Sequence, residues 1–374
     1  MSQEALKQRI SAPGPKKILT LDGGGIRGIM TVEVLAGIEE TIRKQQNRGS
    51  DFVLAHYFDF FAGTSTGAII AACLSLGMST ARIRDFYVES GEQMFDKAFL
   101  LRRFRYKYND ENLAGKLQEE FGEKTTLGSD KLKTLLMMVM RNATTDSPWP
   151  VSNNPGAKYN RPDRPDCNLN IPLWQLVRAS AAAPVFFPPE VVKVGAHEFI
   201  FVDGGTTTYN NPAFQAFLMA TVEPYNLGWA TGENKLLVVS VGTGTSPKAN
   251  ADLAPDEMNL LYNAGSIPSA LISAALNEQD LLCRTFGRCL AGDPLDREVG
   301  DMIDKHGPVM PKLFTYLRYN AELTREGLDS LGLHHIEPKT VQKLDSVEHI
   351  PELQEVGKAV VSHKIKPEHF AAFT

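Results

Sequence analysis

Short apolar runs alternate with amphipathic stretches along the first 245 residues, and turn-forming residues separate them. Residues 18–21, 57–62, 197–202 and 236–241 are apolar or alternating runs of strand length, so we predict a β-strand at each. In residues 29–46 apolar side chains recur every three or four positions, as on one face of a helix. The other helices predicted in this part of the chain are 66–76, 80–95, 111–121, 172–183 and 212–222.

Three segments give a less regular pattern. Residues 133–141 are apolar throughout, and periodicity alone leaves them as either a buried strand or a buried helix. Residues 144–170 are rich in Pro, Asn and Asp and predict a long loop. From about residue 253 onward the pattern is mainly helical, with breaks near 287–294 and 307–311. The alternation of strands and helices predicts an α/β sheet covered by helices on both faces.

The clearest candidate for chemistry is the sequence Gly63-Thr-Ser-Thr-Gly67, between a predicted strand and a predicted helix. A G-x-S-x-G motif in this context is typical of a nucleophile elbow, in which the serine lies at a sharp, strained turn. Gly63 and Gly67 leave room where the chain folds back on itself. The following helix directs its positive end at Ser65, which favours a developing anion. We therefore interpret Ser65 as a nucleophile.

A second glycine cluster, Gly23 to Gly25 with Gly28, follows the first predicted strand in the spacing G-x-G-x-x-G. This spacing fits either a dinucleotide-binding loop or a set of amides that stabilise an oxyanion. A dinucleotide site requires an acidic residue at the end of the next strand, about 20 residues on. Glu39 and Glu40 are near that distance but lie inside the predicted helix. We favour an oxyanion hole, with Arg27 adding positive charge, and keep a nucleotide-binding protein as the alternative.

A nucleophilic serine needs a base, and the strongest candidate is Asp203. The alternating strand before it ends at Asp203-Gly204-Gly205, which delivers a carboxylate with small neighbours to the edge of the sheet. Asp22 also follows a strand, and we interpret it as bracing the glycine loop through backbone hydrogen bonds. None of the eight histidines follows a strand beside glycine, but a Ser–His–Asp esterase for small soluble esters stays open as an alternative.

Composition narrows the class of protein. The chain has 374 residues, of which 43% are hydrophobic and 22% charged, so a packed core is expected. A formal net charge of −5 argues against binding nucleic-acid polymers through bulk charge. The N-terminus has no apolar signal segment and no run approaches a membrane span, so we expect a soluble, cytoplasmic protein. The chain has four cysteines in separate contexts, which predict buried thiols: Cys73, Cys167, Cys283 and Cys289.

In combination, residues 22–28, 63–67 and 203–205 resemble the patatin-like phospholipase family, in their sequences and in their order. The resemblance extends over roughly residues 17 to 245. Further matches are the segments 179–187, 211–212 and 241–244.

The resemblance implies a three-layer α/β/α hydrolase with a mainly helical C-terminal extension. We expect a catalytic domain at 17–217, with 218–374 completing the sheet and packing on the same core. It also implies a Ser65–Asp203 dyad, with the amides of Gly23–Gly25 as oxyanion hole and without metal or organic cofactor. The implied substrates are acyl esters of membrane glycerophospholipids.

Some soluble bacterial relatives are anti-phage effectors that cyclic oligonucleotides activate, so a cyclic dinucleotide is a candidate activator of this chain. The resemblance also implies that the chain acts at the inner membrane surface. Residues 94–108 interleave basic and aromatic side chains, which fits either a segment that contacts membranes or an ordinary crossover packed inward. Its cations are equally suited to the phosphates of a nucleotide. Together with the loop 144–170 and the C-terminal region, residues 94–108 are candidates for a gate that controls access to the active site. Four of the five basic residues in residues 94–108 are the candidates for contacting such phosphates: Arg102, Arg103, Arg105 and Lys107.

Overall fold

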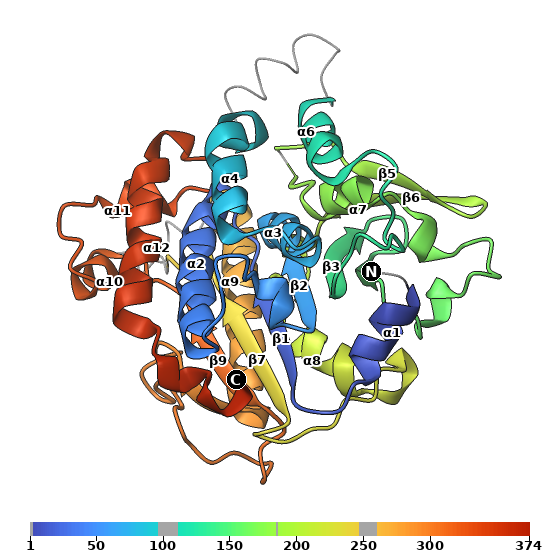
Figure 1. The fold of residues 1–374 in the computed structure, drawn as a ribbon. Helices are drawn as coiled ribbons and strands as arrows, with labels where there is room; N and C mark the ends of the chain where they lie inside the picture. Colours follow the sequence, from blue (N-terminus) through green and yellow to red (C-terminus); the bar gives the residue numbers. More distant parts are fainter. Residues whose placement is uncertain (1–2, 96–110, 185, 247–259) are drawn as a thin grey trace.

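A computed structural model describes residues 3–95, 111–184, 186–246 and 260–374. Over these ranges the chain forms one mixed β-sheet with strand order β5-β6-β3-β2-β1-β7-β9-β8, and β4 pairs with β3 as well (Figure 1). The strands are β1 (Lys16–Leu21), β2 (Phe60–Thr64), β3 (Leu135–Asn142), β4 (Ser147–Ser152), β5 (Glu190–Val194), β6 (His197–Asp203), β7 (Leu236–Val241), β8 (Arg288–Ala291) and β9 (Thr315–Tyr319). Strands β3, β2, β1, β7, β9 and β8 run parallel, and β4, β5 and β6 pair antiparallel to their neighbours.

Helices cover both faces of this sheet, which confirms the predicted three-layer α/β/α arrangement. Successive residues of a strand point to opposite faces, so the strands feed two separate hydrophobic cores. In β1, Leu19 and Leu21 join the larger core, whereas Ile18 joins the smaller one. The larger core includes residues of α2, α3, α4, α6, α7, α10 and α12, and the smaller core includes residues of α8 and α9. The helices are α1 (Gln3–Ser11), α2 (Gly28–Gln45), α3 (Thr66–Ser75), α4 (Thr80–Phe95), α6 (Glu111–Phe121), α7 (Leu173–Ser180), α8 (Ala213–Thr221), α9 (Leu260–Phe286), α10 (Arg325–Ser330), α11 (Pro338–Gln342) and α12 (Ile350–Lys364).

The apolar segment that periodicity left ambiguous is a strand, β3, buried along almost its whole length. The prediction of an uninterrupted loop over 144–170 is wrong, because β4 lies within it. Pro148 and Pro150 made this segment look unlike a strand in the sequence. Because β4 pairs with β3 alone, it is an edge strand, in which proline is tolerated. Strand β5 was not predicted at all, and β2 begins at Phe60 rather than at residue 57.

The C-terminal region is more than a helical extension. It supplies β7, β9 and β8, which continue the parallel sheet beyond β1. Helix α12 packs on α2 over one face, and α9 packs on α8 over the other. Residues 218–374 therefore share both hydrophobic cores with the preceding part of the chain.

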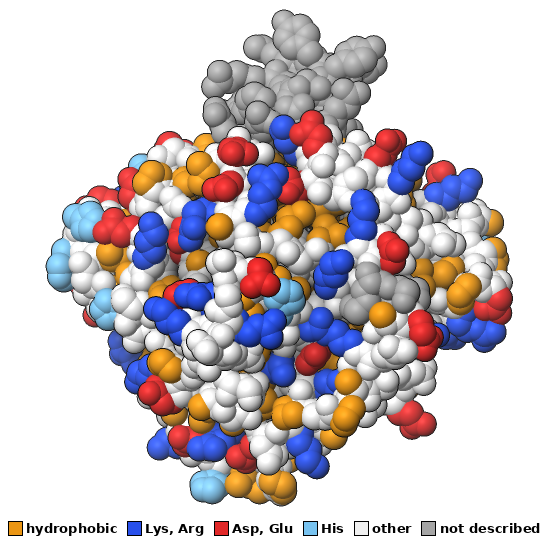
Figure 2. All heavy atoms as spheres, in the orientation of Figure 1, with side chains coloured by type: hydrophobic (Ala, Val, Ile, Leu, Met, Phe, Trp, Pro, Cys, Tyr) orange, Lys and Arg blue, Asp and Glu red, His pale blue; other side chains and the backbone are white. Residues whose placement is uncertain are grey.

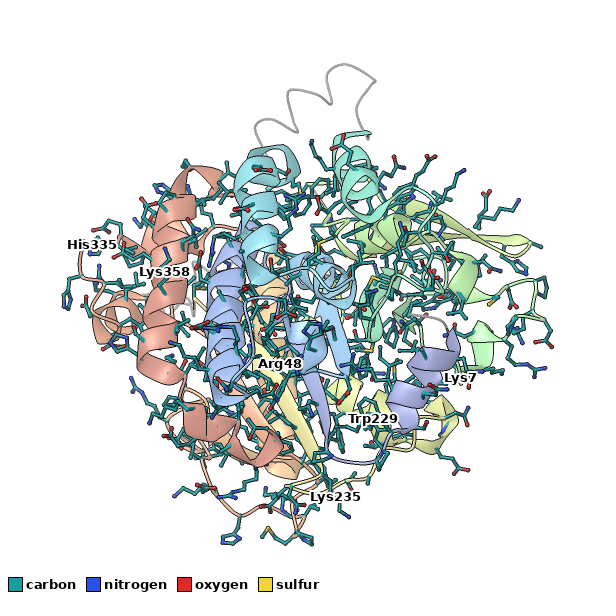
Figure 3. All side chains as sticks on the ribbon, in the orientation of Figure 1. Lys7, Arg48, Trp229, Lys235, His335 and Lys358 are labelled. Atoms are coloured by element: carbon teal, nitrogen blue, oxygen red, sulfur yellow. The ribbon has the colours of Figure 1, made fainter. Side chains whose placement is uncertain are left out.

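The N-terminal helix α1 was also not predicted. Trp229 lies beside it (Figure 3), and the indole Nε1 of Trp229 donates a hydrogen bond to the Ile10 carbonyl at 3.2 Å. All four cysteines are buried and unpaired, as predicted. Basic and acidic side chains are interspersed over the face in Figure 2. Within the described ranges, no helix is both long and apolar enough to cross a bilayer.

Candidate active site

Strand β3 brings the predicted nucleophile and base together. Residues 135–139 of β3 pair with β2, and the next three residues pair with β6. Thr64, the last residue of β2, is opposite Val139, while Asp203, the last residue of β6, is opposite Met140. The two strands thus end at consecutive positions along β3. Ser65, which directly follows β2, therefore lies beside Asp203.

Ser65 occupies the strained turn that the G-x-S-x-G motif predicts. Its backbone has φ +56° and ψ −125°, a conformation that residues other than glycine rarely adopt. The glycines permit the chain to fold back tightly, since a Cβ on Gly63 would lie 2.1 Å from the Gly67 carbonyl oxygen. A Cβ on Gly67 would lie 2.3 Å from the carbonyl oxygen of Leu21. The turn directs Ser65 away from the sheet at the N-terminus of α3, whose positive end favours an anion there.

The Ser65 side chain is hydrogen-bonded to the predicted base. Its Oγ donates to Asp203 Oδ2 at 2.6 Å, and the Gly205 amide donates to Asp203 Oδ1 at 2.6 Å. Asp203 is 5% exposed. Burial raises the pKa of Asp203 to about 6, although the hydrogen bonds from Ser65 and Gly205 favour the ionised form and limit the rise. Above that pH the carboxylate is ionised and correctly placed to accept the Ser65 proton.

Two further residues hold the turn, and sequence reasoning missed both roles. The Ser65 amide donates to Ser180 Oγ at 3.0 Å, and Ser180 Oγ in turn donates to the Val139 carbonyl. Tyr87 on α4 hydrogen-bonds the side chain of Thr66, the residue after the nucleophile, and its hydroxyl also donates to the Thr66 carbonyl at 3.1 Å. Ser180 lies in the segment 179–187 that resembled the family, but no periodic signal marks either side chain as part of the site.

The glycine loop lies against the nucleophile, because a Cβ on Gly23 would be 3.1 Å from Ser65 Cβ. The three predicted oxyanion donors differ in their bonding. The Gly23 amide already donates to the Asn210 carbonyl at 3.1 Å. Within the part of the chain that the structure describes, the amides of Gly24 and Gly25 have no acceptor. Gly24 and Gly25 are therefore the better candidates for binding an oxyanion.

The loop is fixed from three sides. Thr243 Oγ1 donates to the Gly23 carbonyl at 2.8 Å, and the amide of Ile26 donates to the Leu344 carbonyl at 2.9 Å. Gly25 has φ +59°, and a Cβ there would lie 2.3 Å from that same Leu344 oxygen. At the end of the loop, a Cβ on Gly28 would lie 2.4 Å from Thr66 Oγ1. The loop and the nucleophile turn are thus packed directly on each other.

We expected Asp22 to brace this loop through hydrogen bonds with backbone amides, but within the described residues its carboxylate pairs with a side chain instead. Its carboxylate accepts a bidentate pair of hydrogen bonds from Arg318 on β9. Arg27 points toward the C-terminal region, where its Nη1 donates to the Gln342 carbonyl at 3.3 Å. Burial lowers the pKa of Arg27 to about 10, and the attraction of Asp22 partly opposes that shift.

The remaining predicted glycines lie beside Asp203. A Cβ on Gly204 would lie 2.2 Å from the Val139 carbonyl oxygen, so only glycine allows β6 to approach β3 this closely. Gly205 supplies the amide that fixes the carboxylate. This cluster therefore sets the orientation of Asp203 relative to Ser65.

The histidines lie elsewhere. All eight are in the described ranges, and none hydrogen-bonds Ser65 or Asp203. His335 lies at the outer side of the C-terminal helices (Figure 3), where it pairs with Glu355. His56 Nδ1 accepts from the Val53 amide. This arrangement gives no support to a Ser–His–Asp triad.

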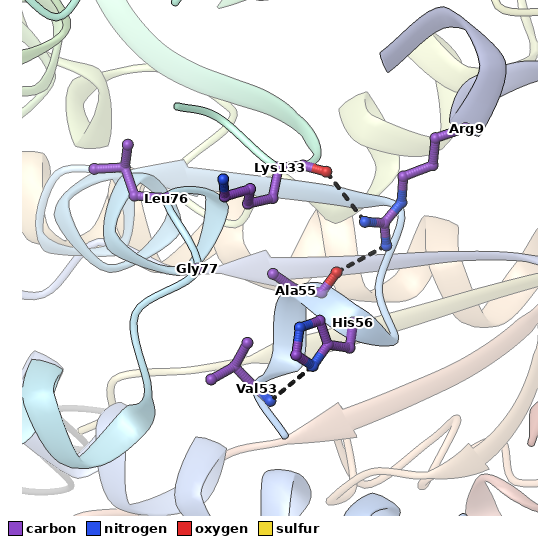
Figure 4. Close-up of a pocket in the computed structure, with 7 residues that line it drawn as sticks. All are labelled: Arg9, Val53, Ala55, His56, Leu76, Gly77 and Lys133. Carbon is purple, nitrogen blue, oxygen red and sulfur yellow. Dashed lines mark hydrogen bonds between the residues drawn. The ribbon is translucent and has the colours of Figure 1, made fainter. Parts of the chain in front are cut away.

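A pocket is lined by residues that include Arg9, His56 and Lys133 (Figure 4). His56 and Lys133 precede β2 and β3, whereas Ser65 follows β2, so the pocket and Ser65 lie near opposite ends of these parallel strands. The guanidinium of Arg9 in this pocket donates to the carbonyls of Lys133, Ala55 and Phe58. Arg9 is therefore bound mainly to the protein's own backbone.

Within the described residues, no group of three or more His, Cys, Asp or Glu side chains could hold a metal ion. The predicted membrane-contact and gating segment, residues 94–108, lies outside the described residues from position 96 onward, and so do all five of its basic residues.

Comparison with known proteins agrees with this geometry. A family profile for patatin-like phospholipases matches residues 19–217, more than half of the chain. The chain belongs to the patatin-like phospholipase family. The matched range includes the glycine loop, Ser65 and Asp203, and it ends before β7.

Individual members of the patatin-like phospholipase family are moderately similar to this chain. Patatin-17 of Solanum cardiophyllum is 30% identical over 246 residues, which cover 61% of this chain and 60% of the relative. The 85/88 kDa calcium-independent phospholipase A2 of Mus musculus is 32% identical over 251 residues, covering 62% of this chain and 27% of the relative. The cGAMP-activated phospholipase of Vibrio cholerae is 32% identical over 210 residues, which cover 53% of this chain and 56% of the relative. The chain spans 60–63% of the length of the plant patatins it matches.

Proposed function

We propose that this chain hydrolyses acyl esters of membrane glycerophospholipids through a Ser65–Asp203 dyad. The observation that carries the proposal is the 2.6 Å hydrogen bond from Ser65 Oγ to Asp203 Oδ2, made by a serine held at φ +56°. Membership of the patatin-like phospholipase family supports the substrate class.

In the proposed reaction, Asp203 accepts the proton of Ser65 as Oγ attacks the ester carbonyl carbon. The resulting tetrahedral oxyanion receives hydrogen bonds from the free amides of Gly24 and Gly25. Collapse of the tetrahedral intermediate expels the lysolipid alkoxide, which takes the proton from Asp203. Water then attacks the acyl-Ser65 ester and gives its proton to Asp203. The bond to Oγ breaks, Asp203 returns the proton to Ser65 Oγ, and the fatty acid leaves. Asp203 therefore acts as base and acid in turn.

The test is hydrolysis of a fluorogenic phospholipid in vesicles by the wild-type chain and by Ser65→Ala, Asp203→Asn and their combination. Each single variant should lose nearly all activity, and the double variant should be no worse than either, because the two groups act as one unit. Single replacement of each histidine is the matched control and should leave most activity. A loss of about a thousandfold in one histidine variant would overturn the dyad in favour of a triad.

We also propose that a cyclic dinucleotide activates the chain at the cytoplasmic face of the inner membrane, as part of an antiviral response. Support comes from the cGAMP-activated phospholipase of Vibrio cholerae, which is 32% identical over the aligned region. A ligand activates only if it binds the active state more tightly than the inactive one. Vesicle hydrolysis with and without a panel of cyclic dinucleotides is the test. Full activity without any ligand, unchanged on addition, would contradict activation.

A further inference from the structure

We propose that Arg318 is a positioning residue that holds the oxyanion loop in its working geometry through Asp22. The proposal rests on the function proposed above, and it assigns a role in that chemistry to a residue about 100 positions beyond the range that the family profile matches. Arg318 touches neither Ser65 nor Asp203 in this structure.

The contact between Arg318 and Asp22 is bidentate and buried. Nη1 of Arg318 lies 2.9 Å from Asp22 Oδ1, and Nη2 lies 2.5 Å from Asp22 Oδ2. The two side chains are only 5% and 3% exposed. A planar guanidinium that meets both carboxylate oxygens fixes the direction of the carboxylate as well as its charge. Asp22 directly precedes Gly23, so the orientation of the pair is transmitted to the first peptide of the glycine loop.

Arg318 is itself held firmly by neighbouring elements. Its Nη1 also donates to Ser240 Oγ on β7 at 2.7 Å, and its Nε lies 3.9 Å from Asp280 Oδ2 on α9. Strand β9, which carries Arg318, pairs with β7 on one side and β8 on the other. The central sheet thus supplies a rigid base for the contact with Asp22.

The buried carboxyl group of Asp22 depends on Arg318 to stabilise its ionised form. Burial raises the pKa of Asp22, and Arg318 is the largest opposing influence. Burial lowers the pKa of Arg318, but Asp22, with smaller contributions from Tyr316 and Asp280, opposes this and the pKa stays above the usual value. Removing one partner leaves an uncompensated buried charge, which is strongly destabilising, whereas removing both does not. A double neutral substitution is therefore the appropriate test of positioning.

The decisive variant is Arg318→Met combined with Asp22→Asn, assayed on a water-soluble ester so that membrane binding plays no part. We expect the folded double variant to lose about 10- to 100-fold in kcat with KM changed less than about threefold, because a displaced oxyanion donor acts on the transition state alone. The single variant Arg318→Lys keeps the positive charge but cannot bind both carboxylate oxygens as a planar guanidinium does. Its kcat should lie between that of the double variant and that of the wild type.

The matched control is Arg84→Met combined with Glu33→Gln. Arg84 and Glu33 form an equally bidentate pair, with both distances 2.7 Å, between α4 and α2. The kcat of this double variant should stay within about threefold of the wild-type value, because the pair lies outside the oxyanion loop. A role for Arg318 in stability alone predicts the same behaviour for both double variants, and that result would overturn the proposal.

Hydrogen exchange at the amides of Gly23 and Ile26, which donate to the carbonyls of Asn210 and Leu344, gives a readout that does not depend on activity. These amides should exchange at least about tenfold faster in the Arg318→Met, Asp22→Asn variant and remain unchanged in the control. Unchanged exchange would overturn the positioning role. If the wild-type chain hydrolyses no ester, the proposed function fails, and exchange alone then decides whether Arg318 positions the loop.

Discussion

At the residue scale, Asp203 meets two conflicting demands. A base must be ionised to accept the Ser65 proton, yet the position that brings it within 2.6 Å of Ser65 Oγ is almost fully buried. Burial raises the pKa of Asp203 to about 6, and the Gly205 amide and the Ser65 hydroxyl limit that rise. A base with a pKa near the working pH combines sufficient ionisation with sufficient basicity.

The first prediction concerns the pH dependence of turnover. Because the ionised carboxylate is the active form, kcat/KM on a soluble ester should rise about tenfold per pH unit well below the pKa of Asp203 and level off above it. With the pKa raised to about 6, the midpoint should lie near pH 6. A profile that is flat from about pH 4.5 to 8 would contradict Asp203 as the base.

The second prediction concerns stability. The folded pKa of Asp203, about 6, lies above the ordinary value of 3.8, so the native state favours the protonated form. The contribution of Asp203 to stability is therefore greatest below about pH 4 and is lost as the pH rises to about 6. Ionising the buried carboxyl group lowers the free energy of unfolding by up to about 3 kcal/mol.

Asp203→Asn stays neutral, avoids this cost, and should raise the melting temperature at pH 7 by several degrees, with little change at pH 4. Differential scanning calorimetry of both proteins at the two pH values tests it. The control is Ser65→Ala, which keeps the carboxylate and should show no such gain. A lower melting temperature for Asp203→Asn than for the wild type at pH 7 would show that the ionised carboxylate does not destabilise the folded protein.

At the scale of elements, the catalytic turn was predictable and much of its support was not. The strand, glycines, serine and helix of residues 60–75 are adjacent in the chain, so a local pattern was sufficient to identify them. The pairing of β2 and β6 at consecutive positions of β3 depends on contacts between distant segments. Strand β9 was missed because Arg318 interrupts its apolar pattern, and the reason for a buried arginine there becomes clear only when Asp22 is placed opposite it.

The third prediction tests the loop between β1 and α2. A Cβ on Gly24 would lie 2.1 Å from Thr243 Oγ1, so Gly24→Ala should displace the loop and lower kcat by about 10- to 1000-fold. Gly115→Ala on α6 is the matched control, because a Cβ there meets nothing within 4 Å. It should leave kcat unchanged and slightly raise stability, since alanine favours helix. Equal kcat in both variants would argue against Gly24 in the oxyanion hole.

At the scale of the whole molecule, the region that the family profile matches contains only part of the sheet. Strand β1 lies between β2 and β7, so a chain that ends at residue 217 leaves one edge of β1 unpaired. It also lacks the α9, β8 and β9 residues that complete the smaller core and the α12 residues that cover α2.

The fourth prediction follows. A chain of residues 1–217 should be insoluble or protease-sensitive, although it contains both Ser65 and Asp203, whereas the full chain should be soluble and resistant. Solubility on expression and limited proteolysis measure the difference. A folded, active fragment of residues 1–217 would show that the C-terminal strands are dispensable.

The contacts of Asp22 with Arg318 and of Ile26 with Leu344 also set the order of events during synthesis. A ribosome builds the chain from its N-terminus, so Ser65 and Asp203 emerge while the partners of Asp22 and Ile26 are still untranslated. A nascent chain then has its nucleophile and base but no braced loop beside them. Under the proposed function, hydrolytic competence is therefore expected only after Leu344 has been translated, so that shorter nascent chains should not attack the membranes of the cell that makes them.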